Sequence, residues 1–499
     1  MRIAYGPHQH AATPLHGTCP DGCDVAPEQA MPGAGLVADR ARVSRLQQYG
    51  PYALALYLLA TTKWGSGLSP FGGPPYITDL VLTLLLVDRA VAAAAHRPVA
   101  VGVEPWVGVI VTALLAWSLI LLAFGSLSQN ALRDAAPYLY GVTVFLVRPP
   151  RESTESAASR ALMAVLIFHA AWVTLVQIFP SIVSQTPLVY GETHVLAVRT
   201  DVDSLVCGLL AAIGLHRALA GRSPARNLLL AGWGATLVLL LSSRAGLLAF
   251  VVQIVIVVLL APARRRLPGK YDARVIVAIL LMCVPLILVG VTRGNSVHRL
   301  SLAVSGNGAA SEANGAIGTE NAREESWKVL VKYIVRDPAR TVRGVGFGPD
   351  FLHDSGADAL LLGTVAATQE DVRSPHNYLL NTWARLGVVG LLLILAMIVA
   401  GLRLVRVVAR RAARIRDDDV LAMLLVASIP VAALVGVVLE SPFGALPYFW
   451  ALGHLSARAC QTGVVPFGRS DRGLTRGGIA WRPDARSPQG AAARASTAS

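Results

Sequence analysis

Apolar residues fill long runs along this chain, and short polar segments rich in Arg, Gly and Pro separate the runs. An α-helix needs about 17–25 apolar residues to cross the hydrocarbon core of a membrane. Because runs of roughly that length recur, the pattern predicts an all-α polytopic membrane protein. We expect about twelve transmembrane helices, with the fourth and the last short, at residues 48–63, 77–95, 105–125, 134–147, 161–180, 202–220, 228–243, 246–262, 275–292, 385–402, 420–439 and 444–458.

The composition agrees with a membrane protein. Of the 499 residues 54% are apolar and only 15% are charged, whereas soluble domains carry about 25% charged residues. The net charge of +14 comes from basic residues spread along the loops, where they favour contact with anionic membrane lipid. No nucleic-acid-binding signature accompanies that charge, so we expect no nucleic-acid partner.

The basic residues also predict the orientation of the helices. If the N-terminus is cytoplasmic, the short inside loops hold nineteen Lys and Arg residues, and the short outside loops hold four. Cytoplasmic loops carry the excess of positive charge in most membrane proteins. We therefore expect a protein of the cytoplasmic membrane with both ends inside, and the four outside basic residues are Lys63, Arg133, Arg199 and Arg244.

The domain organisation follows from these helices. Residues 1–45 and 461–499 are rich in small and polar residues, and we expect two disordered cytoplasmic ends around a membrane domain at 46–460. The long polar segment 293–375, between the ninth and tenth expected helices, is then a large extracytoplasmic loop. No carboxylate, His or Cys cluster with the spacing of metal ligands occurs on that side, so we expect no metal and no cofactor.

One helix is predicted inside this loop. The sequence from Asn321 to Glu324 resembles a capping box. Apolar residues follow at helical spacing up to Pro338, where a helix must end, and a glycine-rich turn spans 343–349. A long loop with an amphipathic helix suits a lid over a cavity at the membrane face; the apolar residues are Trp327, Leu330, Val331, Ile334 and Val335.

Three outside arginines stand at the ends of expected helices. Arg133 has an acidic neighbour in Asp134, and Arg199 has two in Asp201 and Asp203, so each is either ion-paired or functional. Arg244 has no acidic neighbour within ten positions, which favours a functional role. The planar guanidinium group matches the oxygen atoms of phosphate. An outward group of arginines therefore suits a membrane-bound diphosphate, and could replace a metal ion in stabilising it as it leaves.

His376 lies at the start of the tenth expected helix, beside Arg373 and Asn377. Its side chain could simply satisfy hydrogen bonds at the helix end. Imidazole also exchanges protons near neutral pH, so His376 is a candidate general base. We interpret His169 and His454, which lie in or near apolar runs, as packing residues.

Several of these residues resemble the signature of the O-antigen ligase and O-antigen polymerase superfamily. His376 and Asn377, followed by Gly387 and Gly390, resemble its His-Asn…Gly-x-x-Gly element, and Arg244 with Leu248 resembles its Arg-x-x-x-Leu motif. The resemblance covers about residues 130–460 and includes one long late loop, whose matching positions are Arg323, Trp327, Pro338, Gly344, Val345 and Gly346.

The resemblance implies a metal-independent membrane glycosyltransferase with a GT-C-like fold. Such enzymes move a glycan from a polyprenyl-diphosphate carrier, such as undecaprenyl diphosphate, to a hydroxyl group on a glycan, lipid or protein acceptor. It implies that His376 activates the acceptor and that Arg244, the second catalytic residue, binds the diphosphate. The diphosphate would be bound by Arg133, Arg199, Arg323 and Asn377.

Two other functions fit an apolar chain of this kind. A polysaccharide or lipid transporter would carry repeats and broken helices with polar groups near the middle of the membrane. A structural membrane scaffold would not depend on His376 or Arg244. The unusual polar residues of this chain gather at the outer ends of the expected helices, which favours the enzyme.

Overall fold

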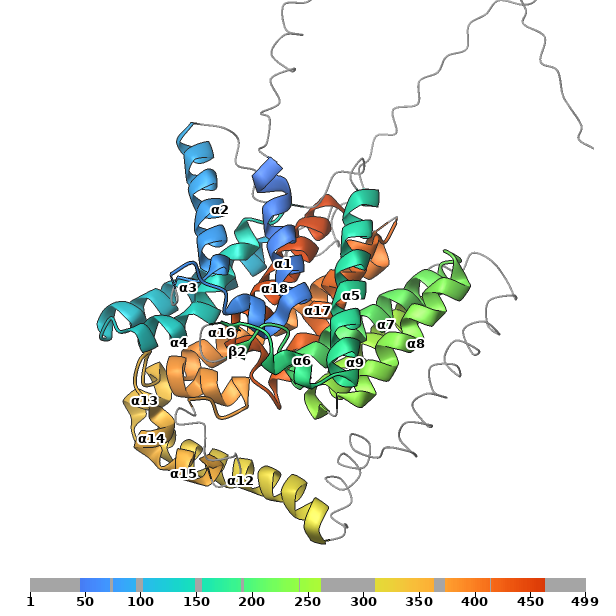
Figure 1. Cartoon of the computed structure of the whole chain (residues 1–499). Helices are drawn as coiled ribbons and strands as arrows, with labels where there is room; N and C mark the ends of the chain where they lie inside the picture. The colour runs from blue at the N-terminus through green and yellow to red at the C-terminus, as the bar shows by residue number, and fades with distance from the viewer. Residues whose placement is uncertain are drawn as a thin grey trace, which may run out of the picture. The chain divides into compact units, whose positions relative to one another are not determined.

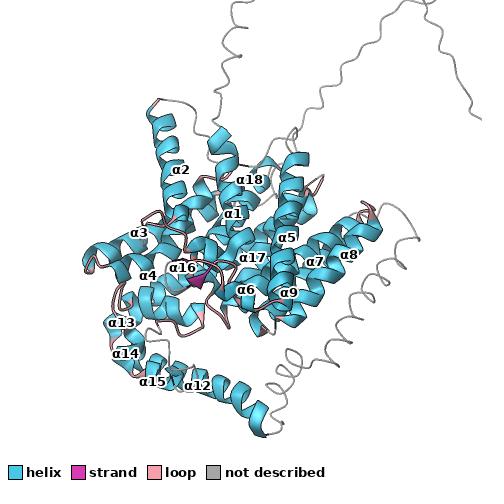
Figure 2. Cartoon of the chain, in the orientation of Figure 1, coloured by secondary structure: helices cyan, strands magenta, loops and turns pink. Residues whose placement is uncertain are grey.

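The computed structural model describes residues 45–71, 75–95, 102–148, 155–189, 193–241, 243–261, 310–362, 373–412 and 414–462. Figures 1 and 2 show that these residues are almost entirely helical. Most of both predicted disordered ends, and the expected helix 275–292, lie outside the described residues.

The first half of the chain forms most of a helical bundle. A 3₁₀ turn, η1 (Tyr140–Phe145), follows α4, and the strands β1 (Leu188–Val189) and β2 (Thr193–His194) make a small antiparallel pair before α7. The helices are α1 (Arg45–Ser66), α2 (Ile77–Ala94), α3 (Pro105–Phe124), α4 (Gln129–Leu139), α5 (Glu155–Ile178), α6 (Ser181–Ser184), α7 (Thr200–Leu219), α8 (Pro224–Leu240) and α9 (Arg244–Leu260).

The second half adds helices to the same bundle and to the long loop. A second 3₁₀ turn, η4 (Val438–Glu440), joins the last two helices. The helices are α12 (Ala310–Val335), α13 (Pro338–Arg343), α14 (Phe351–Ser355), α15 (Ala357–Leu362), α16 (Tyr378–Arg411), α17 (Asp417–Ala433) and α18 (Pro442–Gln461).

The helices agree with a membrane protein. Among the described residues α3, α5, α7 and α16 are long and apolar enough to cross a membrane, and α8 and α9 are shorter apolar helices. The expected helix 134–147 differs from the structure. There α4 ends at Leu139, two residues after its internal Pro137, and the chain tightens into η1. Proline has no backbone N–H to donate and its ring crowds the preceding turn, so Pro137 weakens the helix expected over this run.

The centre of the bundle lies along α7, α17 and α18, most of whose residues are buried. Glycines bring α7 and α8 together: a Cβ atom on Gly234 would lie 2.5 Å from the carbonyl oxygen of Cys207, and one on Gly214 would lie 2.8 Å from that of Asn227. Small residues allow such close approach between membrane helices, whose association rests on packing.

Helix α16 is broken at Gly387, where φ is 68° and ψ is −170°. The break leaves carbonyl groups without helical partners, and other segments supply donors. Val345 N donates to Ala384 O at 2.8 Å, Gly346 N donates to Arg385 O at 3.0 Å, and Trp117 Nε1 donates to Leu386 O at 2.9 Å. The glycine-rich turn and α3 thus fix the first two turns of α16.

Replacing Gly387 with alanine should destabilise the protein. The backbone conformation there is almost exclusive to glycine and costs other residues about 1–3 kcal/mol, and a Cβ atom would also collide with the carbonyl oxygen of Val342. Gly356→Ala is the control, because Gly356 also has a positive φ, of 74°, but its Cβ atom would meet nothing within 4 Å. We expect the Tm of the detergent-solubilised protein to fall further for Gly387→Ala, and equal changes would contradict a close contact at Gly387.

The helix predicted in the long loop is present but begins earlier. Helix α12 starts at Ala310, so Asn321 lies inside it and the predicted capping box is wrong. Leu330 and Ile334 are buried as expected, whereas Val331 and Val335 are exposed. The helix packs against α15 through an apolar cluster that includes Leu330 and Ile334, and Trp327 lies against the same cluster.

Candidate functional site

A cavity of about 460 Å³ lies where the start of α16 meets α4, the start of α7 and the loop between α17 and α18. Several residues that could bind an anion or move a proton line it. The lining residues that matter for its chemistry are Lys63, Arg133, Asp134, Arg199, Arg373, Ser374, His376, Arg385 and Glu440.

Asp134 organises one wall of the cavity. Its Oδ2 atom lies 2.7 Å from Arg385 Nη1 and 3.1 Å from Arg373 Nη2, and it accepts a hydrogen bond from Gly348 N at 3.1 Å. All three side chains are nearly buried. Asp134 therefore holds two guanidinium groups at the cavity, and a second carboxylate, that of Asp350, lies 3.6 Å from Arg373 Nη1.

Arg199 also lines the cavity and is partly neutralised. Its Nε atom lies 2.9 Å from Asp201 Oδ1, and its backbone N–H donates to Asp203, which caps the start of α7. The guanidinium group also lies over the ring of Phe443, 5.2 Å from the ring centre. These contacts orient the Arg199 side chain, and of the two alternatives left open for Arg199 the structure shows the ion pair, formed with Asp201.

His376 lies in the loop that enters α16 and has a positive φ of 55°. Its backbone N–H donates to Ser374 Oγ at 3.1 Å, and Trp327 Nε1 of α12 donates to Pro375 O at 2.7 Å. Helix α12 thus holds the segment that carries His376. Burial, with the nearby positive charges of Arg323 and Arg199, lowers the pKa of His376 to about 4. The imidazole is therefore neutral at pH 7 and can accept a proton.

Glu440 is the second group of the cavity, after His376, whose pKa the surroundings shift strongly. Burial raises its pKa to about 7, against the lowering effects of Ser374, Arg385 and Arg199. Its Oε1 atom is buried and has no hydrogen-bond partner among the described residues. The carboxyl group can therefore change protonation within the cavity near neutral pH.

The cavity brings together three of the residues predicted from the sequence, namely Arg133, Arg199 and His376. Arg323 lies near enough to His376 to affect its pKa but does not line the cavity. Asn377 caps α16, because its Oδ1 atom accepts a hydrogen bond from Leu380 N at 3.1 Å.

Arg244 is placed at the same end of the bundle, outside the cavity lining. It is the first residue of α9, after the N-cap Ser243. A Cβ atom on Gly436 would lie 3.6 Å from both Ala245 Cβ and Asp201 Oδ2. The start of α9 therefore lies close to the ion pair of Arg199.

The cavity is also lined by residues that the sequence pattern did not indicate as site residues, namely Lys63, Arg373, Arg385 and Glu440. One signal could have found Arg385, because a charged residue inside an apolar run is costly unless it serves a function or has a partner. Glu440 carries the same signal, at the junction of two apolar runs.

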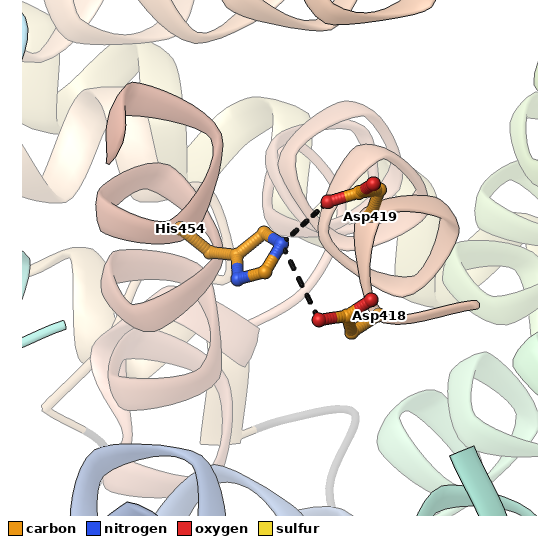
Figure 3. A group of neighbouring side chains, drawn as sticks. All are labelled: Asp418, Asp419 and His454. Carbon is orange, nitrogen blue, oxygen red and sulfur yellow. Dashed lines mark hydrogen bonds and ion pairs between the residues drawn. The ribbon is translucent and has the colours of Figure 1, made fainter. Parts of the chain in front are cut away.

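A different polar group lies near the junction of α16 and α17 and is shown in Figure 3. His454 Nε2 lies 2.8 Å from Asp419 Oδ1 and 3.9 Å from Asp418 Oδ2. The three side chains are close enough together to hold a metal ion. Two guanidinium groups, of Arg416 and Arg458, already contact Asp419, so the arrangement fits an internal ion-pair network better than a metal site. The prediction that His454 only packs is wrong.

Comparison with known proteins places part of the chain in a family. The sequence model of the O-antigen ligase family matches residues 229–395, from α8 to the middle of α16. The match includes Arg244, Arg323 and His376. No curated protein matches the chain. The resemblance seen in the sequence is thereby confirmed for residues 229–395, which match the O-antigen ligase family.

Proposed function

We propose that this protein is a membrane glycosyltransferase that moves a glycan from a polyprenyl-diphosphate carrier to an acceptor hydroxyl group. The reaction would take place on the outer face of the cytoplasmic membrane. The excess of basic residues in the loops expected to be cytoplasmic predicts that the start of α7 lies on that outer face. The observation that carries the proposal is the shared cavity, which an imidazole that burial keeps neutral at pH 7 lines together with several arginines.

The arrangement suits a single displacement. His376 would take the proton of the acceptor hydroxyl while that oxygen forms a bond to the anomeric carbon of the glycan. The bond from this carbon to the diphosphate would break, and the diphosphate would leave with the electron pair. Arg199 and Arg133, with the guanidinium donors of Arg373 and Arg385 at the same cavity, would stabilise the departing anion without a metal ion.

A bound diphosphate would also adjust the base. In the empty cavity the positive charges help to lower the pKa of His376. A diphosphate would offset these charges, so the pKa of His376 would rise and the imidazole would become a better proton acceptor once the donor is in place.

The pH dependence of kcat/KM tests the two titratable groups. This constant reports the free enzyme, in which His376 stays neutral down to about pH 4. Glu440 is protonated below about pH 7 and charged above it. A charged carboxylate would repel the diphosphate, so we expect kcat/KM to fall several-fold as the pH rises through 7.

Glu440→Gln should remove this decrease and leave kcat/KM nearly level between pH 5 and 8. A bend near pH 6.5 that persists in Glu440→Gln would mean that the pKa of the base is close to its ordinary value, against the burial of His376.

A transporter is the second candidate, because broken helices also occur in transporters. Helix α16 is broken at Gly387, and inside the bundle His169 Nε2 lies 3.7 Å from Asp203 Oδ1, with both side chains buried. The family match favours the enzyme.

The assay that separates the two candidates uses purified protein in detergent, where no compartments exist. With a polyprenyl-diphosphate-linked oligosaccharide and an acceptor glycan, we expect new glycosidic product and release of polyprenyl diphosphate, with and without EDTA. The absence of product with all acceptors would favour transport, and activity that is lost in EDTA and restored by a divalent ion would contradict the metal-free scheme.

A further inference from the structure

We propose that a second pocket, at the opposite end of α7 from the candidate active site, binds the phosphate headgroup of an anionic phospholipid. The pocket has a volume of about 880 Å³ and lies between the first halves of α5 and α8. It is larger than the cavity around His376 and shares no lining residue with it.

The position of the pocket follows from α7. Arg199 precedes the first residue of this helix and lines the cavity near His376, whereas Arg217 is in its last turn and lines the second pocket. A helix of 20 residues is about 30 Å long, close to the thickness of a bilayer core. The two pockets therefore open on opposite sides of the membrane, and the charge of the loops puts the second one on the cytoplasmic side.

The pocket has an excess of positive charge. Five arginines and one acidic residue, Glu155, line it. Asp417, beneath the pocket, lies 2.7 Å from Arg217 Nη2 and 3.2 Å from Arg222 Nη1, and Glu155 Oε1 lies 3.3 Å from Arg414 Nη2. The other two arginines, Arg160 and Arg226, form no ion pair within the described part of the chain.

Phosphate is the ligand that this excess of charge suits. Guanidinium groups bind phosphate oxygens through paired N–H donors. Arg160 on α5 and Arg226 on α8 extend from the two helices that enclose the pocket, so one headgroup could contact both.

The apolar part of the pocket favours a lipid over free phosphate. Met163, Ala164 and Ile167 of α5 and Leu230 of α8 line it beneath the arginines. Next to them Phe168 and Leu229 are exposed, and their side chains suit contact with acyl chains.

Farther along, the same two helices are joined by a hydrogen bond from Trp233 Nε1 to Thr174 Oγ1 at 3.0 Å. The pocket thus narrows toward the middle of the bundle. Basic pockets between membrane helices on the cytoplasmic side commonly bind anionic headgroups.

The test uses the full-length protein in detergent, titrated separately with phosphatidylglycerol, phosphatidylcholine and inorganic phosphate. The variant is Arg160→Ala with Arg226→Ala. The matched control is Arg410→Ala with Arg411→Ala, which removes the same charge from exposed arginines at the end of α16 that do not line the pocket. A third variant, Ala164→Trp, fills the apolar part without changing the charge. A Tm measured for each variant verifies folding.

We expect the wild-type protein to bind phosphatidylglycerol more tightly than the other two ligands. Each arginine near an anionic lipid contributes about fivefold in affinity, so the first variant should bind phosphatidylglycerol about 25-fold more weakly. Ala164→Trp should also bind it weakly, and the control should bind within about twofold of wild type.

Equal loss in the two double variants, or equal affinity for phosphatidylcholine, would overturn the proposal. Equal affinity for free phosphate would also overturn it, in favour of a site for a soluble anion. No glycan donor is present, so the result does not depend on the proposed transferase activity.

Discussion

Replacing His376 with alanine is expected to lower kcat for glycosyl transfer by about 10²–10⁴-fold, the usual contribution of a general base. His376 is the imidazole that lines the cavity, and its lowered pKa keeps it able to accept a proton. The measurement is product formation by purified protein at saturating donor.

Two further variants make this result specific. Asn tolerates a positive φ better than alanine does, so His376→Asn should keep the backbone at φ 55° while removing the base. His353→Ala is the control, because His353 is 78% exposed and pairs with Asp358 outside the cavity. Wild-type turnover in both His376 variants would show that the imidazole takes no part in the reaction.

Replacing Arg199 with lysine is expected to lower kcat by about 10²–10³-fold, the range seen when one donor to a developing anion is removed. A lysine keeps the charge but cannot reproduce the planar pair of N–H donors. It would also lose the geometry of the Asp201 pair and of the contact with Phe443. The measurement is the rate of polyprenyl-diphosphate release at saturating donor.

Arg244→Lys provides a graded comparison. Since Arg244 lies near the Arg199 pair but outside the cavity lining, we expect a smaller decrease than for Arg199→Lys. Arg336→Ala, in an exposed position after α12, should leave the rate unchanged. If Arg199→Lys turned over as fast as wild type, paired donation to the diphosphate would be ruled out.

Much of the helical architecture could be predicted from the sequence, because a long apolar run has few other structures available in a membrane. The grouping of Arg133, Arg199 and His376 could be predicted too. Successive transmembrane helices run in opposite directions, so the helix ends that carry these three residues lie on the same side of the membrane. The start of α12 was harder to predict. Asn is a residue type that often caps a helix, so the sequence around Asn321 predicts a start there. In the structure α12 begins eleven residues earlier, at Ala310.

The details of the site depend on contacts between distant residues. Arg373 and Asp134 are 239 positions apart, and no local pattern indicates their pairing. The break at Gly387 is stable because the turn at Val345 and Gly346 supplies the missing donors. A glycine in an apolar run is as typical of close helix packing as of a helix break. The sequence therefore does not predict the break at Gly387, and it does not predict that Arg385, two residues before it, lines the cavity.

The most direct measurement is an experimental structure of the full-length protein with a non-transferable polyprenyl-diphosphate-linked sugar. The proposed function predicts that phosphate oxygens lie about 3 Å from the guanidinium groups of Arg199 and Arg133, with the anomeric carbon facing His376. A diphosphate bound elsewhere, or an imidazole turned away from the sugar, would contradict it.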